Sequence, residues 1–266
     1  MRKITVLCSV IIALALPLFA QNGSDSSSAK PNASIQKMLK EISAKRLKAY
    51  NLKLVSFGTR NTNSAQDDPK RGIGAARDWI FDEFNRISKD CDGCLEVEKQ
   101  TYLQKAQRRV PKDINITNVI ATLKGTKNPD RIYVVSGHYD SMCGNSSDGE
   151  CDAPGANDDG SGTVAVIEMA RVMSKMKFDA TIMFMTVAGE EQGLLGAKHF
   201  VKEAVAKKLD IEAMFTNDII GGVKTYKNRP DRNEIRVFAE GVPSNETERQ
   251  ARLRRSVGGE NDSPAR

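Results

Sequence analysis

The fold is decided by the stretch RIYVVSGHYD, residues 131–140, a nearly unbroken apolar run that ends in a histidine and an aspartate. A run of this kind is typical of a β-strand that is buried on both faces. A second buried strand is expected at 181–191, and a further strand at 211–218. Strands buried on both faces belong to a largely parallel sheet that helices cover on each side.

Helical sequence separates these strands. Residues 160–176 carry apolar side chains at helical spacing on one face, at Val166, Ile167, Ala170 and Met173. Residues 193–208 form the next expected helix. The alternation of strand and helix predicts an α/β protein: a three-layer α/β/α domain with a mostly parallel, twisted central sheet. Two helices and two strands are expected before this unit, at 34–52, 72–88, 95–103 and 118–125.

The composition suits one globular domain of substantial size, with 266 residues of which 39% are hydrophobic and 28% charged. A net charge of +6 raises the question of nucleic-acid binding. The basic residues are scattered among Asp and Glu, without interleaved aromatic residues or zinc-finger spacing. We therefore interpret the charge as solvated surface and expect no nucleic-acid partner.

The first twenty residues, MRKITVLCSVIIALALPLFA, have the pattern of a signal peptide. Two basic residues precede an apolar run, Pro17 interrupts it, and Ala20 offers a small residue for cleavage; an uncleaved anchor is the alternative reading. Residues 21–33 resemble a flexible Ser-rich linker, which leaves 34–266 as the main domain. No later segment approaches the about 20 apolar residues that span a bilayer. We expect an exported protein, periplasmic or extracellular, with no stable membrane insertion after signal cleavage.

Loss of Cys8 with the signal leaves an even number of cysteines, which favours disulfides in an oxidising compartment. Four cysteines allow three connectivities. A bond between Cys143 and Cys151 would close a short loop, and we expect this disulfide. Cys91 and Cys94 form a CxxC that suits a redox motif, half a zinc knuckle or a local disulfide. We favour the disulfide, because neither a second CxxC nor a thioredoxin-like pattern is present.

The loop APGANDDGSG, residues 153–162, contains two adjacent aspartates. Asp among glycines suits a turn or a helix cap, but it also suits a metal site. The carboxyl ends of strands in an open α/β sheet line one crevice, where this loop is joined by other acidic and imidazole groups. These groups are His138, Glu190, Glu191 and Asp218. Because clustered carboxylates repel one another, they need cations to stay ionised, so we interpret one of the two aspartates as a metal ligand.

Four motifs, in this order along the chain, resemble those of the co-catalytic di-zinc aminopeptidases. They are HYDS (138–141), APGANDDGSG (153–162), VAGEEQGLLGAKHF (187–200) and TNDIIG (216–221). This family includes secreted bacterial leucyl aminopeptidases and is related to glutamate carboxypeptidase and glutaminyl cyclase. The resemblance covers about residues 70–222 and implies a zinc-exopeptidase-like fold.

The resemblance also implies a role for each matching residue. It matches His138, Glu191 and Asp218 to metal ligands. It matches Asp158 to the carboxylate that bridges two ions, and Glu190 to the general base. A bridging carboxylate suits ions about 3.5–4 Å apart, which polarise a peptide carbonyl and lower the pKa of a shared water toward about 7. Glu190 would take the proton of that water and give it to the leaving amine.

Two further expectations concern the surroundings of these ligands. Asp140 lies two residues after His138, on the same side of an extended strand, and is interpreted as the group that orients the imidazole. The resembled family has a cis peptide bond after the bridging aspartate, so we expect one between Asp158 and Asp159.

One departure from the family pattern concerns its fifth ligand, a second histidine that comes late in the sequence. The only other histidine here is His199, at a position where the family uses no ligand, so we expect it to serve packing or the surface. His138, Asp158 and Asp218 can complete one three-ligand site, whereas the other retains Asp158 and Glu191. We therefore expect this chain to be the front portion of a longer protein.

Together these features predict a zinc-dependent aminopeptidase that acts on peptides with a free N-terminus and holds two Zn²⁺ ions when complete. One alternative is a glutaminyl-cyclase-like enzyme with one working zinc. Another is a non-catalytic descendant that serves as a binding module. Glu190 and Glu191 argue against the last, because a retired site has no chemical need for a base beside a ligand.

Overall fold

A computed structural model describes residues 32–222 of the chain. The expected signal peptide and most of the expected linker lie outside the described residues, as does 223–266, so the predicted domain boundaries stay predictions. The elements follow one another as α1 (Ala33–Glu41), α2 (Ala44–Val55), α3 (Gly72–Asp90), β1 (Leu95–Gln104), β2 (Ile114–Leu123), β3 (Asn128–His138), α4 (Gly160–Met173), β4 (Ala180–Val187), α5 (Leu195–Ala206) and β5 (Asp210–Thr216).

The five strands form one sheet in the order β1-β2-β4-β3-β5. Strand β3 pairs in parallel with both β4 and β5. Strand β2 is antiparallel to both β1 and β4, so β1 and β2 form a hairpin at one side of the parallel unit. The predicted α/β sheet is confirmed, and it is mixed because of this hairpin.

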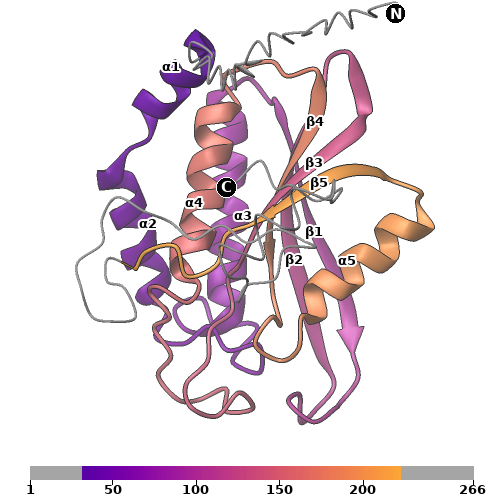
Figure 1. The fold of residues 1–266 in the computed structure, drawn as a ribbon. Helices are drawn as coiled ribbons and strands as arrows, with labels where there is room; N and C mark the ends of the chain where they lie inside the picture. Colours follow the sequence, from indigo (N-terminus) through magenta and orange to yellow (C-terminus); the bar gives the residue numbers. More distant parts are fainter. Residues whose placement is uncertain (1–31, 223–266) are drawn as a thin grey trace, which may run out of the picture.

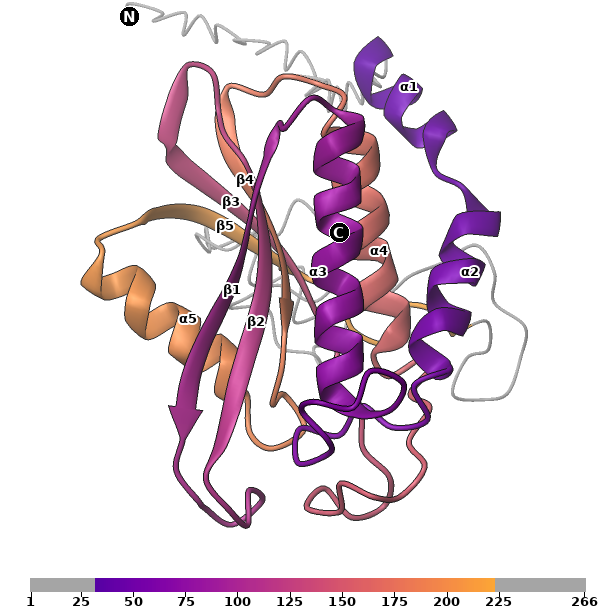
Figure 2. The same cartoon turned by 180° about the vertical axis from the view of Figure 1, so that it is seen from behind.

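Helices cover both faces of the sheet (Figures 1 and 2). Helices α3 and α4 lie against one face with α1 and α2 outside them, and α5 lies against the other face. Successive residues of β4 point to opposite faces, so Phe184 packs in the core beneath α3 and α4, whereas Met185 packs with Phe200 of α5. Because both faces of the sheet are covered, its central strands need unbroken apolar sequence, and the three-layer prediction is confirmed.

The segment 34–52, expected as one helix, forms the two helices α1 and α2. The break lies at Ile42 and Ser43, both of which have extended backbone. The Ser43 side chain accepts a hydrogen bond from the Arg46 backbone N–H at 3.3 Å, and its own N–H donates to Glu168 at 2.8 Å. Serine is a preferred N-cap, so it starts a new helix where apolar spacing alone predicts continuation.

Both expected disulfides are present, between Cys91 and Cys94 and between Cys143 and Cys151. The first closes the turn from α3 into β1, and the second closes a loop between β3 and α4. Asp148 lies near the sulfurs of the second pair, but both sulfurs are already bonded to each other. Between residues 32 and 222, no helix is both long and apolar enough to cross a membrane.

A close approach of two backbones fixes the start of α4 beside the end of β3. A Cβ added to Gly137 would lie 2.8 Å from the carbonyl carbon of Gly162. Thr163 donates its hydroxyl to the His138 carbonyl at 2.8 Å. The Asp159 side chain caps the helix by accepting the Gly162 N–H at 2.9 Å. Strand β3 and helix α4 can meet this closely because position 137 carries no side chain.

We expect Gly137→Ala to lower the free energy of unfolding by about 1–3 kcal/mol, because the added methyl group forces the start of α4 away from β3. Urea denaturation measures the change. Gly144→Ala is the matched control, since a Cβ there meets nothing within 4 Å. Its effect should stay within about 0.5 kcal/mol. Equal unfolding midpoints for the two variants would contradict the close approach.

Candidate metal site

Three separate segments meet at the carboxyl edge of the parallel strands. His138 ends β3, Asp158 lies just before α4, and Asp218 follows β5. Their donor atoms all lie within 4.8 Å of one another. The His138 Nε2 atom is 3.1 Å from Asp158 Oδ1 and 3.9 Å from Asp218 Oδ1. The imidazole is only 3% exposed, whereas the two carboxylates are about half exposed, so the cluster has a fixed inner side and an open outer side.

The two adjacent aspartates of the acidic loop have different environments. The peptide bond between Asp158 and Asp159 is cis, as the family resemblance implied. Asp158 faces His138, whereas Asp159 is fully buried. Asp159 accepts backbone N–H groups from His138 at 3.1 Å, Gly162 at 2.9 Å and Ile219 at 3.3 Å. The turn-and-cap interpretation therefore describes Asp159, and Asp158 is left to face the crevice.

Asp140 connects the imidazole to the end of the neighbouring strand. It is fully buried, and its Oδ1 atom lies 3.4 Å from His138 Nδ1. The same carboxylate accepts the backbone N–H groups of Glu190 and Glu191, each at 3.2 Å, and the Thr62 hydroxyl at 3.4 Å. Asp140 thus lies where it can orient His138, and it also holds the backbone of the Glu–Glu pair.

Glu190 and Glu191 follow β4 and are half-buried. Burial raises the pKa of both carboxyl groups. For Glu191, the nearby carboxylates of Asp158 and Asp140 add to the burial effect and bring the pKa to about 7. Neither glutamate belongs to the group of donor atoms within 4.8 Å. The structure thus gathers His138, Asp158 and Asp218 more tightly than the second predicted pair, Asp158 and Glu191.

The charge of the His138 imidazole depends on its acidic neighbours. Burial lowers its pKa, but the carboxylates around it outweigh burial and raise the pKa to about 10. Asp140 makes the largest contribution among these carboxylates, and Asp159 and Glu190 add to it. In the metal-free protein the imidazole therefore carries a proton at neutral pH, and the site balances negative carboxylates with a cation.

His199 lies on α5, away from this group of residues. Its ring stacks on Tyr102, with ring centroids 4.1 Å apart and planes 12° from parallel. Because the chain contains two histidines in all, His138 is the one imidazole at this edge. The environment of His199 agrees with the expectation that it serves packing.

Sequence analysis missed the segment 59–64, in which every side chain is polar and every residue is buried. It lies beneath the site, where Thr62 reaches Asp140 and Asn63 donates to the Ser146 carbonyl at 3.3 Å. Polar sequence without periodicity normally indicates an exposed loop. The sequence therefore held no local signal that this segment is interior.

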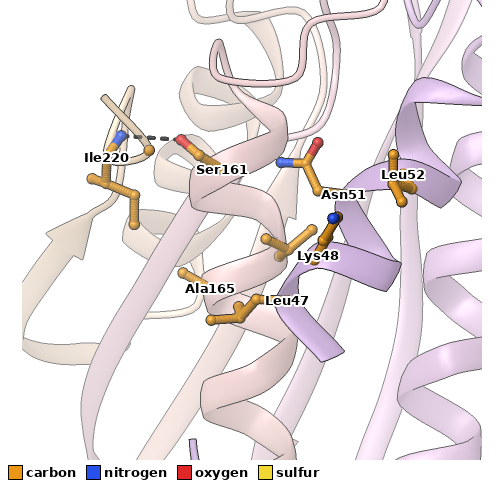
Figure 3. Close-up of a pocket in the computed structure, with 9 residues that line it drawn as sticks. Leu47, Lys48, Asn51, Leu52, Ser161, Ala165 and Ile220 are labelled. Atoms are coloured by element: carbon orange, nitrogen blue, oxygen red, sulfur yellow. Dashed lines mark hydrogen bonds between the residues drawn. The ribbon is translucent and has the colours of Figure 1, made fainter. Parts of the chain in front are cut away.

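A shallow pocket lies between α2, the start of α4 and residues 220–221 (Figure 3). Its lining is mainly apolar and includes Leu47, Leu52 and Val164. Asn51 at its rim donates to the Ala156 carbonyl at 2.7 Å and so supports the acidic loop from outside. We assign no chemistry to this pocket, because Lys48 is the one titratable residue among those described that line it.

Comparison with known proteins relates this chain to a known peptidase family. Residues 118–248 match the sequence profile of peptidase family M28. A "Probable zinc metalloprotease" of Pyricularia oryzae is 46% identical over 237 residues, which are 89% of this chain and 47% of the relative. A protein of the same description from Leptosphaeria maculans is 45% identical over 89% of this chain and 55% of its own length. The chain spans about half the length of the curated relatives it matches.

Solved structures with a similar fold include a Zn-dependent exopeptidase from Parabacteroides distasonis, with a TM-score of 0.56 and 21% identity over 68% of this chain and 63% of that one. An aminopeptidase from Aneurinibacillus has a TM-score of 0.53 and 17% identity, covering 71% and 73% of the two chains. A glutaminyl cyclase from Porphyromonas gingivalis has a TM-score of 0.55 and 21% identity, covering 69% and 64%. These likenesses confirm the zinc-exopeptidase-like fold. The chain carries a peptidase family M28 domain, matched over residues 118–248.

Proposed function

We propose that this chain is part of a zinc-dependent aminopeptidase that hydrolyses peptides from a free N-terminus. The observation that carries the proposal is the meeting of His138, Asp158 and Asp218 at the strand edge, beside the half-buried pair Glu190 and Glu191. The match to peptidase family M28 and the names of the fungal relatives support a metallopeptidase. The preference for N-termini rests on the motif resemblance.

The donor set suits zinc. One imidazole nitrogen and two carboxylates are ligands that zinc accepts in catalytic sites. The position of Asp140 near Nδ1 leaves Nε2 of His138 free to coordinate a metal. We propose that His138, Asp158 and Asp218 hold one ion, and that Asp158 and Glu191 contribute to a second. When bound, zinc polarises the peptide carbonyl and lowers the pKa of water.

Glu190 is the proposed general base. It takes a proton from the attacking water and returns it to the departing amine, which requires a carboxyl group of intermediate basicity. Burial raises the pKa of Glu190 above its ordinary value, in the direction this task needs. The hydrogen bond from the Glu190 backbone N–H to Asp140 holds the backbone from which the Glu190 side chain projects.

A second candidate is a glutaminyl-cyclase-like enzyme with one zinc. It is favoured by the tight group of donors formed by His138, Asp158 and Asp218, in which Glu191 takes no part. Release of an N-terminal residue together with two zinc ions per chain supports the aminopeptidase. Cyclisation of a peptide that begins with glutamine, together with one zinc ion, supports the cyclase. Peptide binding without either reaction supports a binding module.

We also propose that the protein is exported. The two disulfides support this, because disulfides persist in oxidising compartments and are rare in the cytosol. Peptides in such a compartment are the proposed substrates.

Glu190→Ala should keep the zinc content of the protein while lowering hydrolysis of aminoacyl anilides by at least about 10²–10⁴-fold, because it removes a base and no ligand. Glu191→Ala is the matched variant one residue away and should lose zinc. Elemental analysis and an anilide assay measure the two effects. Equal loss of zinc in both variants would contradict the assignment of Glu190 as a base that holds no metal.

The stability of the metal-free protein should fall as pH rises from about 5 to about 8. The pKa of Asp159, like that of Glu191, is raised to about 7, mainly by burial, so the folded state binds these protons more tightly than the unfolded state. Their contribution is therefore lost as pH rises toward 7. The pKa of His138 is raised to about 10, so its contribution is lost between its ordinary pKa and that value. All three groups act in the same direction.

Zinc should reverse this trend, because it binds deprotonated ligands and its binding strengthens with pH. Urea midpoints measured with a chelator and with added zinc, at about pH 5 and about pH 8, test both statements. A metal-free midpoint that rises over this interval would contradict the charge balance described for the site.

A further inference from the structure

We infer that Arg60 is a positioning residue: its guanidinium holds the end of β3 and the loop of Asp158 in the arrangement that receives the metal. The inference rests on the metal site proposed above. Arg60 follows helix α2 and is fully buried, with 0% of its surface exposed. A buried cation is costly unless its donors are satisfied, so the groups that satisfy it show what it organises.

The Arg60 guanidinium donates to backbone carbonyls from three segments. Its Nε atom donates to the Tyr139 carbonyl at 2.7 Å. Its Nη1 atom donates to Pro154 at 2.7 Å and to Leu54 at 3.3 Å, and its Nη2 atom donates to Gly155 at 2.9 Å. The end of α2, the end of β3 and the acidic loop are thus joined through one planar group.

Two of these segments carry proposed metal ligands. Tyr139 directly follows His138, so the bond to its carbonyl fixes the strand end that presents the imidazole. The Gly155 carbonyl accepts the Gly160 N–H at 2.9 Å as well as the Arg60 Nη2 donor. Gly155 and Gly160 flank the turn that contains Asp158. Arg60 therefore holds the base of the turn and the end of the strand at a set separation.

The space around Gly155 shows how closely Arg60 fits. Gly155 has φ of +46°, and a Cβ there would lie 2.8 Å from Arg60 Nη2 and 2.6 Å from the Asp158 carbonyl oxygen. A side chain at this position would push the guanidinium and the turn apart. Glycine meets both requirements, because it tolerates positive φ and leaves room for the donor.

The backbone of Arg60 makes a second link between the same segments. Its N–H donates to the Ser141 hydroxyl at 3.1 Å, and its carbonyl accepts the Ser141 N–H at 3.2 Å. The Ser141 hydroxyl in turn donates to the Ala153 carbonyl at 2.7 Å. Residues 60, 141 and 153 thus form a chain of hydrogen bonds parallel to that of the guanidinium.

The geometry requires arginine in particular. The planar guanidinium directs its donors along several fixed directions at once, whereas a lysine ammonium is a single point that cannot reach carbonyls on three segments. Burial lowers the pKa of Arg60 to about 10, and the carboxylates of Asp140, Asp159 and Asp158 oppose that change. The group therefore stays charged at neutral pH and offsets part of the negative charge of the site.

The test compares Arg60→Lys with Arg171→Lys by measuring zinc affinity in competition with a chromophoric chelator. Arg171 is a suitable control because it is 12% exposed and its donors go to Glu168 on its own helix α4 and to the Glu41 carbonyl at the end of α1. Both variants keep the charge and lose the planar donor group. We expect Arg60→Lys to weaken zinc binding by about 10–100-fold, as is usual for groups that orient metal ligands, while Arg171→Lys stays within about twofold of the wild type.

Urea midpoints of both variants separate positioning from general stability. The inference is supported if both variants lose a comparable amount of stability while only Arg60→Lys loses zinc affinity. Zinc affinity of Arg60→Lys equal to that of the wild type, or reduced equally in both variants, overturns it. If the wild-type chain binds no zinc, both the proposed metal site and this inference are overturned. If the wild type binds zinc and Arg60→Lys binds it equally well, only this inference is overturned.

Ser141→Ala serves if Arg60→Lys does not fold, as judged by circular dichroism. This variant removes the hydroxyl that connects the Arg60 backbone to Ala153 and leaves the guanidinium in place. We expect a smaller loss of zinc affinity, about two- to tenfold, because one of two parallel links remains. An unchanged affinity in this variant overturns the inference.

Discussion

The satisfaction of two buried carboxylates at the carboxyl edge of the sheet is the constraint on which the rest of the structure depends. Asp140 and Asp159 are removed from water, so each must find donors in the protein. Both are satisfied by backbone N–H groups from other segments of the chain. Asp140 accepts from the residues after β4, and Asp159 accepts from β3, α4 and the residue after Asp218. Segments far apart in sequence are therefore held together by groups that cannot themselves leave the interior.

The site has an inner and an outer layer as a consequence. The inner layer consists of Asp140, Asp159 and Arg60. The hydrogen bonds of these three side chains go to backbone groups or to neighbouring side chains of the protein. Asp158 and Asp218 form part of the outer layer, and their half-exposed carboxylates face the crevice. This division separates rigidity from reactivity, because the inner residues fix the backbone while the outer side chains remain free to meet a ligand.

The sheet shows which features follow from local pattern. Strands β3 and β4 are covered on both faces, and the unbroken apolar sequence that this burial requires made both strands predictable. The polar residues at the end of each apolar run were recognisable for the same reason. Strand order could not be predicted in the same way, because the antiparallel pairing of β2 with β4 joins residues about 60 positions apart, from Leu123 with Ile182 to Val119 with Thr186. The break at Ser43 was not predicted, since apolar spacing continues through it. The boundary is marked by the Ser43 side chain, which caps α2 by accepting the Arg46 N–H, and by the bond from the Ser43 N–H to Glu168.

The sequence by itself determined the α/β class, the two disulfides and the set of chemical groups at the strand ends, because each of these depends on neighbours within one element or loop. The roles predicted for His138, Glu190 and the other site residues stay predictions, although the structure brings several of them close together. The family resemblance singled out Asp158, but only the tertiary structure decided that Asp159 caps a helix and that Arg60 lies buried near both aspartates. The hydrogen bonds of Arg60 join residues that are 79 positions (Tyr139) and 95 positions (Gly155) away along the chain. No periodicity in a sequence records a hydrogen bond across such a separation.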